Sequence, residues 1–383
     1  MNDAVRFPSL SELRERRSAK WTQYDAGVLP MPVAEMDCLL AEPIAQTLID
    51  AVRRGDTGYP PMDGVPSHAF AEFAADTWGW APDSRRCVLS SDVSVAGIAA
   101  LRTLVPDGSA VAISSPVYPP FFAWPGRAGM TLVDVPLLGA DRGYALDLAG
   151  LERAFADGVR GYVLCHPHNP VGRLVPEDEL AALADLAQRY DVLVVADEIH
   201  APLTLPGQEF TPYLTVSEAA RATGVALHSP SKAWNLAGLK AAFLVYEDPR
   251  FDEPLAGQRH TLPWNAGHFG ALAAVPAYRE SREWLAALRG HLADNHALLR
   301  RELAHRLPGA SCPVAQAGYL AWIDVQACGY GPDPAGRILE VGRLALGIGS
   351  TFGPSGAGHV RMNIGCHPDL IPEAVDRMVA ASA

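Results

Sequence analysis

The fold is decided by residues 161–200, GYVLCHPHNPVGRLVPEDELAALADLAQRYDVLVVADEIH. The pattern predicts an apolar strand over residues 161–165, an amphipathic helix over 176–190 and a second apolar strand over 192–196. A strand, a helix and a strand in this order indicate two parallel strands of one sheet with the helix packed on its face. This stretch therefore predicts an α/β protein.

The same alternation extends in both directions from this unit. Pro43 begins a helical run over residues 44–54, which Gly55 ends. Repeated alternation predicts a mostly parallel sheet with helices on both faces. Further strands are predicted at 86–89, 110–114, 131–135, 225–228 and 241–246, and further helices at 93–105, 119–128 and 148–156.

The C-terminal part of the chain predicts a second, smaller layer. After residue 246 the pattern is strongly helical through Leu307, which indicates a connecting arm. We expect a large domain over residues 45–285 and a small α/β domain formed by residues 1–44 together with 286–383. The small domain is indicated by shorter strand and helix patterns at 319–325, 337–346, 359–364 and 372–378.

Composition and charge exclude several classes of protein. The chain has 383 residues, a formal net charge of -12 and no basic patch, which argues against nucleic acid as a partner. No apolar run reaches the roughly 18 residues of a membrane-spanning helix, and the N-terminus lacks the apolar core of a signal peptide. The six cysteines lie far apart without a CxxC pair, which fits reduced thiols. We expect a cytoplasmic protein that binds neither nucleic acid nor a membrane.

Lysine is rare in this sequence. Of 31 basic residues only three are lysines, Lys20, Lys232 and Lys240. Only these can supply an amine nucleophile, because arginine stays protonated. Lys20 has charged neighbours and is expected on the surface, whereas Lys240 begins an apolar strand, where it could snorkel or contact an anion. Lys232 follows the strand at 225–228 and is expected to form an imine.

Two other predicted strands also end in polar residues. His166, His168 and Asn169 follow the first strand of the opening unit, and Asp197 follows the second. Ligands of open parallel sheets bind outside the carboxyl ends of the strands, so these residues and Lys232 are expected to line one crevice. Asp197 could be a helix cap or a surface carboxylate, or a buried carboxylate that meets a protonated ring nitrogen. No metal is expected at the two histidines, because no third ligand is near.

A further polar turn, SSDVS at 90–94, joins the strand at 86–89 to the helix at 93–105. Its backbone N–H groups and the Ser94 hydroxyl could bind a phosphate at the helix N-terminus. Asp92 could instead cap the helix, which would put a negative charge where the phosphate should lie. Both interpretations stay open from the sequence.

A lysine for an imine, a carboxylate for a pyridinium nitrogen and a helix N-terminus for a phosphate are the groups that bind pyridoxal phosphate. Seven motifs follow one another along nearly the whole chain: VAEMD 33–37, GDTGY 55–59, SPVYPPFF 115–122, PHNPVGR 167–173, DEIH 197–200, SKAWNLAG 231–238 and RMNI 361–364. In these motifs the sequence resembles fold-type-I pyridoxal-phosphate enzymes of the class I/II aminotransferase superfamily, and within it the MalY/PatB group of cystathionine β-lyases. The resemblance implies a large cofactor-binding domain and a smaller α/β domain.

The resemblance also implies a role for each residue around the cofactor ring. Lys232 would form the imine and move protons, and Asp197 would pair with the pyridine nitrogen. Asn169 would hydrogen-bond the phenolic oxygen, and Tyr118, also catalytic, would stack on the ring face. His200 stands beside the phenolic oxygen, where many aminotransferases have a tyrosine, and this difference favours the lyase group.

Phosphate and substrate contacts are implied in the same way. Arg361 would bind the substrate carboxylate, and Ala34 would also contact the substrate. Tyr59, a further catalytic tyrosine, would reach the phosphate of the neighbouring subunit, which implies a homodimer. Asp92 and Lys240 depart from the family pattern, so their contact with the phosphate stays open. The remaining phosphate contacts would come from Val93, Ser94, Ser229 and Ser231.

We expect a carbon–sulfur β-lyase that cleaves L-cystathionine or another S-conjugate of L-cysteine to pyruvate, ammonia and a thiol. One alternative is an aminotransferase on the same fold. Another is a protein of this fold whose main role is to bind and regulate a partner. Intact Lys232, Asp197 and Arg361 argue against a loss of catalysis.

Overall fold

The computed structural model describes residues 5–382. Within this range one large sheet is formed by β2 (Cys87–Ser90), β3 (Ala110–Ile113), β4 (Thr131–Asp134), β5 (Val159–Cys165), β6 (Leu193–Asp197), β7 (Gly224–His228) and β8 (Ala242–Val245). Their order in the sheet is β2-β8-β7-β6-β5-β3-β4. β8 runs antiparallel to both neighbours and all other neighbours are parallel, so the mostly parallel sheet is confirmed.

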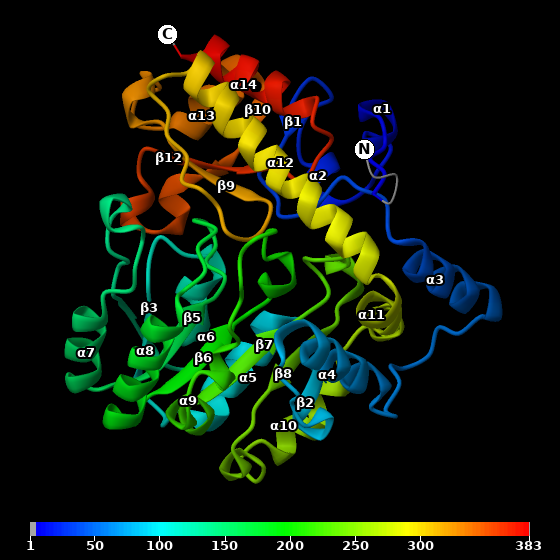
Figure 1. The fold of residues 1–383 in the computed structure, drawn as a ribbon, viewed down its shortest axis with the longest axis vertical. Coiled ribbons are helices and arrows are strands. Elements are labelled where there is room, and N and C mark those ends of the chain that lie inside the picture. The colour runs from blue at the N-terminus through cyan, green and yellow to red at the C-terminus, as the bar shows by residue number, and fades with distance from the viewer. Residues whose placement is uncertain (1–4, 383) are drawn as a thin grey trace.

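Helices cover both faces of this sheet (Figure 1). On β6, Leu193 and Val195 pack into one hydrophobic cluster, whereas Val194 and Ala196 pack into the other. Burial on both faces explains why the strand is an apolar run rather than an alternation. The first cluster includes α5 (Val93–Leu104), α6 (Trp124–Arg127) and α10 (Ala256–Trp264), and the second α4 (Val65–Trp78), α7 (Leu148–Ala156), α8 (Glu177–Tyr190), α9 (Glu218–Thr223) and α11 (His268–Glu280).

Two smaller sheets lie at the other end of the molecule (Figure 1). β1 (Leu29–Pro30) pairs in parallel with β10 (Leu344–Ala345), and β12 (His359–Asn363) lies antiparallel between β11 (Gly347–Ile348) and β9 (Leu320–Asp324). The first of these pairs confirms that N-terminal residues pack on the C-terminal layer. The same part of the molecule contains α1 (Leu10–Leu13), α2 (Ala19–Thr22), α13 (Pro334–Gly342) and α14 (Leu370–Ala381).

Two further helices, α3 (Glu42–Arg54) and α12 (Arg282–Arg306), lie outside the groups described above. α3 ends at Gly55, whose φ of 68° is the left-handed conformation that glycine adopts without strain. α12 extends from α11 toward the smaller sheets (Figure 1). The helix expected at 119–128 is a 3₁₀ turn, Pro119–Ala123, followed by the short α6, because its prolines lack the N–H that a continuous helix needs. No helix within residues 5–382 is long and apolar enough to span a bilayer.

The sheet brings distant segments to one edge. β2, β3, β5, β6 and β7 all run in one direction, since β2 and β7 are both antiparallel to β8. Their carboxyl ends therefore lie at the same edge, where open α/β sheets bind their ligands. The candidate residues that follow the ends of β2, β5, β6 and β7 therefore lie at this edge.

Gly97→Ala is expected to destabilise the protein, although alanine favours a helix. A Cβ at Gly97 in α5 would overlap the fully buried indole of Trp124. Overpacking costs about 1–3 kcal/mol, more than the ~1 kcal/mol that alanine gains over glycine inside a helix. Gly290→Ala in α12 is the matched control, because a Cβ there meets no atom within 4 Å. Thermal unfolding should show a lower midpoint for the first variant only, and the opposite order would contradict this packing.

Candidate active site

Lys232 lies in the loop after β7, and its amine faces the segment that follows β1. Lys232 Nζ donates a hydrogen bond to the Ala34 carbonyl oxygen at 3.0 Å. Burial, followed by the positive charge of Arg361, lowers the pKa of this amine to about 8, while the carboxylate of Asp197 acts in the opposite direction. An amine with such a pKa is a nucleophile and proton carrier near neutral pH.

Asp197 is the last residue of β6 and is only 3% exposed. Its Oδ1 accepts a hydrogen bond from the Ile199 N–H at 3.1 Å. Burial raises the pKa of this carboxyl to about 7, although the Ile199 N–H and the charge of Lys232 both lower it. The interpretation as a surface carboxylate is therefore wrong. A buried carboxylate in this state favours a ligand that brings a positive charge.

Arg361 lies in the middle of β12 and is also buried. Its Nη1 donates to Asn169 Oδ1 at 3.2 Å and its Nη2 to the Pro32 carbonyl oxygen at 2.8 Å. The guanidinium lies 4.9 Å from the centroid of the Phe352 ring, and Nε has no partner among residues 5–382. Burial lowers the pKa of Arg361 to about 10. A buried guanidinium held by neutral groups is suited to a carboxylate ligand.

His200 and Tyr118 complete this side of the site with neutral rings. Burial lowers the pKa of His200 to about 3, and the charges of Lys232 and Arg361 act in the same direction. Burial also raises the pKa of the Tyr118 hydroxyl, and the nearby charge of Asp197 adds to the effect. Both groups are therefore uncharged near neutral pH.

At the start of α5, Asp92 caps the helix. Its Oδ1 accepts a hydrogen bond from the Val95 N–H at 2.9 Å, so the capping interpretation is confirmed. Its Oδ2 lies 3.3 Å from Lys240 Nζ, and the ammonium thus offsets the negative charge at the helix N-terminus. Ser229 Oγ donates to a backbone carbonyl and accepts from the Ser231 N–H at 3.0 Å. Phosphate contacts from Val93, Ser94, Ser229 and Ser231 stay predictions.

Tyr59 lies apart from this group within the chain. It is on the loop between α3 and α4, with 79% of its surface exposed. Its ring packs edge to face against Trp264 of α10, with the centroids 5.6 Å apart. The role of Tyr59 in a neighbouring subunit stays a prediction.

The expectation that Lys20 lies on the surface is wrong. Lys20 is 1% exposed, and its Nζ lies 2.7 Å from Oδ1 of the equally buried Asp37. A run of charged neighbours suggests an exposed segment, but the carboxylate that makes burial of Lys20 tolerable is distant in the sequence. Local charge pattern alone could not find this pair.

Sequence reasoning also missed a tyrosine and a second buried pair. Tyr319 OH donates to the Ala34 carbonyl oxygen at 3.0 Å, the same oxygen that Lys232 contacts. Glu198 Oε2 lies 2.9 Å from His228 Nε2, and both side chains are buried. The sequence held one signal for the Glu198–His228 pair, which is its position next to candidate residues. Glu198 follows Asp197, and His228 ends the strand before the Lys232 loop.

Comparisons with known proteins agree with this fold and site. The model of the family "Aminotransferase class I and II" matches residues 29–378. The chain is 38% identical to a putative cystathionine beta-lyase of Mycobacterium tuberculosis (97% of this chain, 96% of the relative) and 31% identical to a cystathionine beta-lyase of Corynebacterium glutamicum (98% and 100%). A crystal structure of a putative PLP-dependent beta-cystathionase from Corynebacterium diphtheriae matches with a TM-score of 0.94 and 35% identity over 99% of both chains. The chain therefore belongs to the class I and II aminotransferase family, and the expected family and fold class are confirmed.

The raised pKa of Asp197 predicts a pH dependence of stability in the protein prepared without cofactor. Between the ordinary pKa of about 4 and the folded-state pKa of about 7, the folded protein keeps a proton that the unfolded chain has lost. The contribution of Asp197 to the free energy of unfolding should therefore fall as the pH rises through this window, by a few kcal/mol at most, whereas the buried His200, with its lowered pKa, contributes in the opposite direction. Asp197→Asn should remove the Asp197 contribution, so in chemical denaturation its free energy of unfolding should rise more, or fall less, with pH than that of the wild type. The exposed Asp107→Asn is the control, and an equal slope in all three proteins would contradict the buried carboxyl.

Proposed function

We propose that this protein is a pyridoxal-phosphate-dependent carbon–sulfur β-lyase. It would convert L-cystathionine or another S-substituted L-cysteine, with one water, into pyruvate, ammonia and a thiol. The observation that carries the proposal is the set of three buried ionisable groups, Lys232, Asp197 and Arg361, each with a pKa shifted toward its neutral form and none in an ion pair within residues 5–382. The choice of a lyase is supported by full-length similarity to relatives named cystathionine beta-lyase.

The side chains fit the cofactor. Lys232 provides the amine that would hold it covalently, and Asp197 is a buried carboxyl that a protonated ring nitrogen would favour in its charged form. Asn169 would hydrogen-bond the phenolic oxygen of the ring, and Tyr118 would stack on its face. When bound, pyridoxal phosphate supplies an electron sink for the charge left at Cα after proton removal.

The protein's own side chains would bind the substrate and transfer its proton. Arg361 would hold the substrate carboxylate, with its Nε free of protein partners among the described residues. The Lys232 amine would remove the Cα proton, since its pKa of about 8 allows it to accept and return a proton. The neutral His200 beside it adds no competing charge. Loss of the thiolate from Cβ then leads to pyruvate and ammonia.

A homodimer with shared sites is part of the proposal. Tyr59 is exposed and packs against the exposed Trp264, and the exposed Val52, Met62 and Val65 lie within about seven residues of Tyr59 along the chain. Exposed apolar side chains that gather in one region are typical of an interaction surface. A second copy that covered them would bury Tyr59 and could bring it to the phosphate end of the partner's site.

We also propose two domains, over residues 45–285 and over residues 1–44 with 286–383. The division is supported by the sheets, because the strands of the large sheet lie between Cys87 and Val245 and the small sheets combine segments from both ends of the chain. The six free cysteines support a cytoplasmic location, where thiols stay reduced.

The first functional prediction separates a lyase from an aminotransferase, which the family name keeps as a second candidate. Elimination leaves the cofactor ready for another turnover, whereas transamination needs a keto acid to restore it. We expect sustained release of pyruvate and thiol from L-cystathionine with no keto acid present. Lys232→Ala should reduce turnover by at least about 10³-fold, because it removes the proton carrier. A single turnover that resumes only with a keto acid would support the aminotransferase.

The second functional prediction tests the role of Tyr59 across subunits. Tyr59→Ala and Lys232→Ala chains are each expected to be inactive, because each lacks one part of the shared site. Random mixing should restore about a quarter of wild-type activity, since half of the dimers are mixed and contain one intact site. Each variant mixed with itself is the control. No recovery in dimers shown to be mixed would mean that Tyr59 does not act in the partner's site.

A further inference from the structure

Residues 32–38, called the strap here, follow β1 without belonging to a helix or strand. Met36, Asp37 and Cys38 are nevertheless buried. Buried backbone N–H and C=O groups need hydrogen-bond partners, and the carbonyl groups of the strap find theirs mostly on side chains, whereas the Asp37 N–H donates to the Gly365 carbonyl oxygen at 2.8 Å. The strap therefore depends on side chains from elsewhere in the chain.

At one end, the strap contacts the two cationic groups of the candidate site. Lys232 Nζ donates to the Ala34 carbonyl oxygen at 3.0 Å, and Arg361 Nη2 donates to the Pro32 carbonyl oxygen at 2.8 Å. Asn363 Nδ2 bridges the carbonyl oxygens of Val33 and Glu35, both at 2.6 Å. The strap is thus a direct link between the amine and the guanidinium.

At the other end, the N-terminal segment fixes the strap. The Lys20 ammonium is 2.7 Å from Asp37 Oδ1 and 3.3 Å from the Glu35 carbonyl oxygen, so one buried group contacts the strap at two points. Arg16 donates to the carbonyl oxygens of Met36, Asp37 and Cys38 at 3.4, 3.0 and 3.2 Å. These contacts lie on both sides of Met36.

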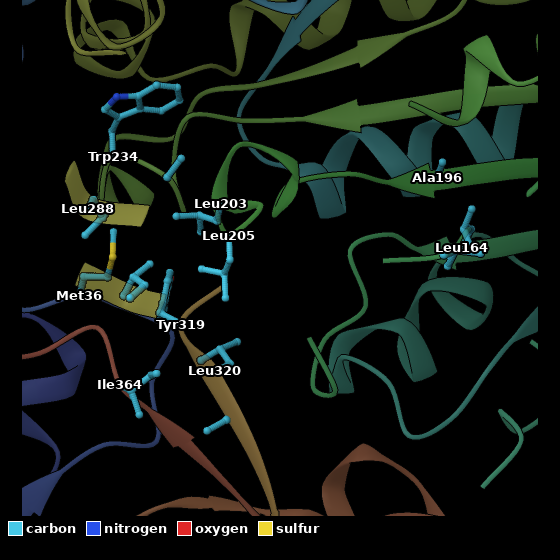
Figure 2. Packing of buried hydrophobic residues seen from close by; sticks show 14 of the residues in the cluster. Met36, Leu164, Ala196, Leu203, Leu205, Trp234, Leu288, Tyr319, Leu320 and Ile364 are labelled. Atoms are coloured by element: carbon cyan, nitrogen blue, oxygen red, sulfur yellow. The ribbon is translucent and has the colours of Figure 1, made fainter. Parts of the chain in front are cut away.

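Hydrophobic packing at Met36 does not define the strap by itself. Figure 2 shows the Met36 side chain in the same part of the core as Leu288 and Tyr319, with Trp234 nearby. Met36 is an unbranched side chain that adapts to irregular surroundings, so its packing tolerates rotation and small shifts of the backbone. Hydrogen bonds to a fixed ammonium and guanidinium are directional, so they do not tolerate such shifts of the backbone.

We propose that Lys20 and Asp37 are positioning residues for substrate binding. Their ion pair fixes the strap and, through Ala34 and Pro32, the spacing between the Lys232 amine and the Arg361 guanidinium. An amino acid is held by its carboxylate while its Cα proton faces the amine, so this spacing sets its affinity. The inference rests on the proposed amino-acid site, and it concerns residues that touch neither substrate nor cofactor.

Lys20→Met tests the proposal in the cofactor-loaded enzyme. We expect KM for the amino-acid substrate to rise about tenfold or more with a much smaller change in kcat, as a shifted binding group predicts. Cofactor affinity, measured by fluorescence titration, should stay within about twofold. Hydrogen exchange of the peptide that contains residues 33–38 should become faster, because a strap no longer held by Lys20 would open more often from Asn235 Oδ1 and the Gly365 carbonyl oxygen, which accept from the Met36 and Asp37 N–H groups.

Arg86→Met is the matched control. Arg86 pairs with Asp252 at 2.6 Å, away from the strap, so its loss should lower the unfolding midpoint without changing KM or the exchange of residues 33–38. Lys20→Met leaves Asp37 buried and unpaired and could prevent folding. Arg16→Met, at a half-buried residue, then provides the same readouts with a milder change.

Several outcomes would overturn the proposal. Unchanged exchange of residues 33–38 in Lys20→Met, or in Arg16→Met where the first variant does not fold, would show that the strap does not depend on these contacts. Faster exchange with an unchanged KM would show that the strap does not set affinity, and an equal rise of KM in Arg86→Met would show general destabilisation. Transamination by the wild type would overturn only the lyase proposal, because KM for the amino acid can be measured in either reaction.

Discussion

A buried backbone needs hydrogen-bond partners, and the rest of the candidate site depends on how the strap, which has no neighbouring strand, meets this constraint largely through side chains. Its carbonyl groups receive hydrogen bonds from Lys232 and Arg361, two groups on different sheets. The same backbone is bound by Asn235, three residues beyond Lys232, through both the N–H and the carbonyl of Met36. The large sheet, the small sheets and the N-terminal segment are therefore joined at the site by hydrogen bonds to one backbone.

Burial shifts the pKa values of the site residues, and it also removes the hydration that would stabilise their charged forms. Lys232, Asp197 and Arg361 all have pKa values moved toward the neutral form, because each would lose hydration when charged. The surrounding hydrophobic core includes Trp234 and Tyr319 in Figure 2, and none of the three groups forms an ion pair within residues 5–382. A ligand with a cationic ring nitrogen and an anionic carboxylate would complete the charge pattern, so the polar groups are arranged before a ligand arrives.

Much of the fold was predictable, because parallel strands buried on both faces leave a strong pattern. Asp197 and Lys232 could be found from the sequence since each follows an apolar strand, and parallel strand ends must meet. The Lys20–Asp37 pair and the contacts of Tyr319 could not be found, because they depend on side-chain approach between segments with no local pattern in common. The turn at residues 90–94 is an intermediate case: the sequence left capping and phosphate binding open, the Asp92 carboxylate caps the helix, and phosphate binding there stays a prediction.

The scarcity of lysine gives the molecule an unusual chemical surface. One lysine is buried in an ion pair, a second lies inside the candidate site, and Lys240 is the remaining exposed one, paired with Asp92 at the helix start. Reagents that acylate amines, and cellular acetylation in the same way, find almost no lysine targets on the outer surface of the described residues. Among lysine side chains, amine-directed labelling or immobilisation would therefore act mainly at Lys240, which is paired with Asp92 at the N-terminus of α5.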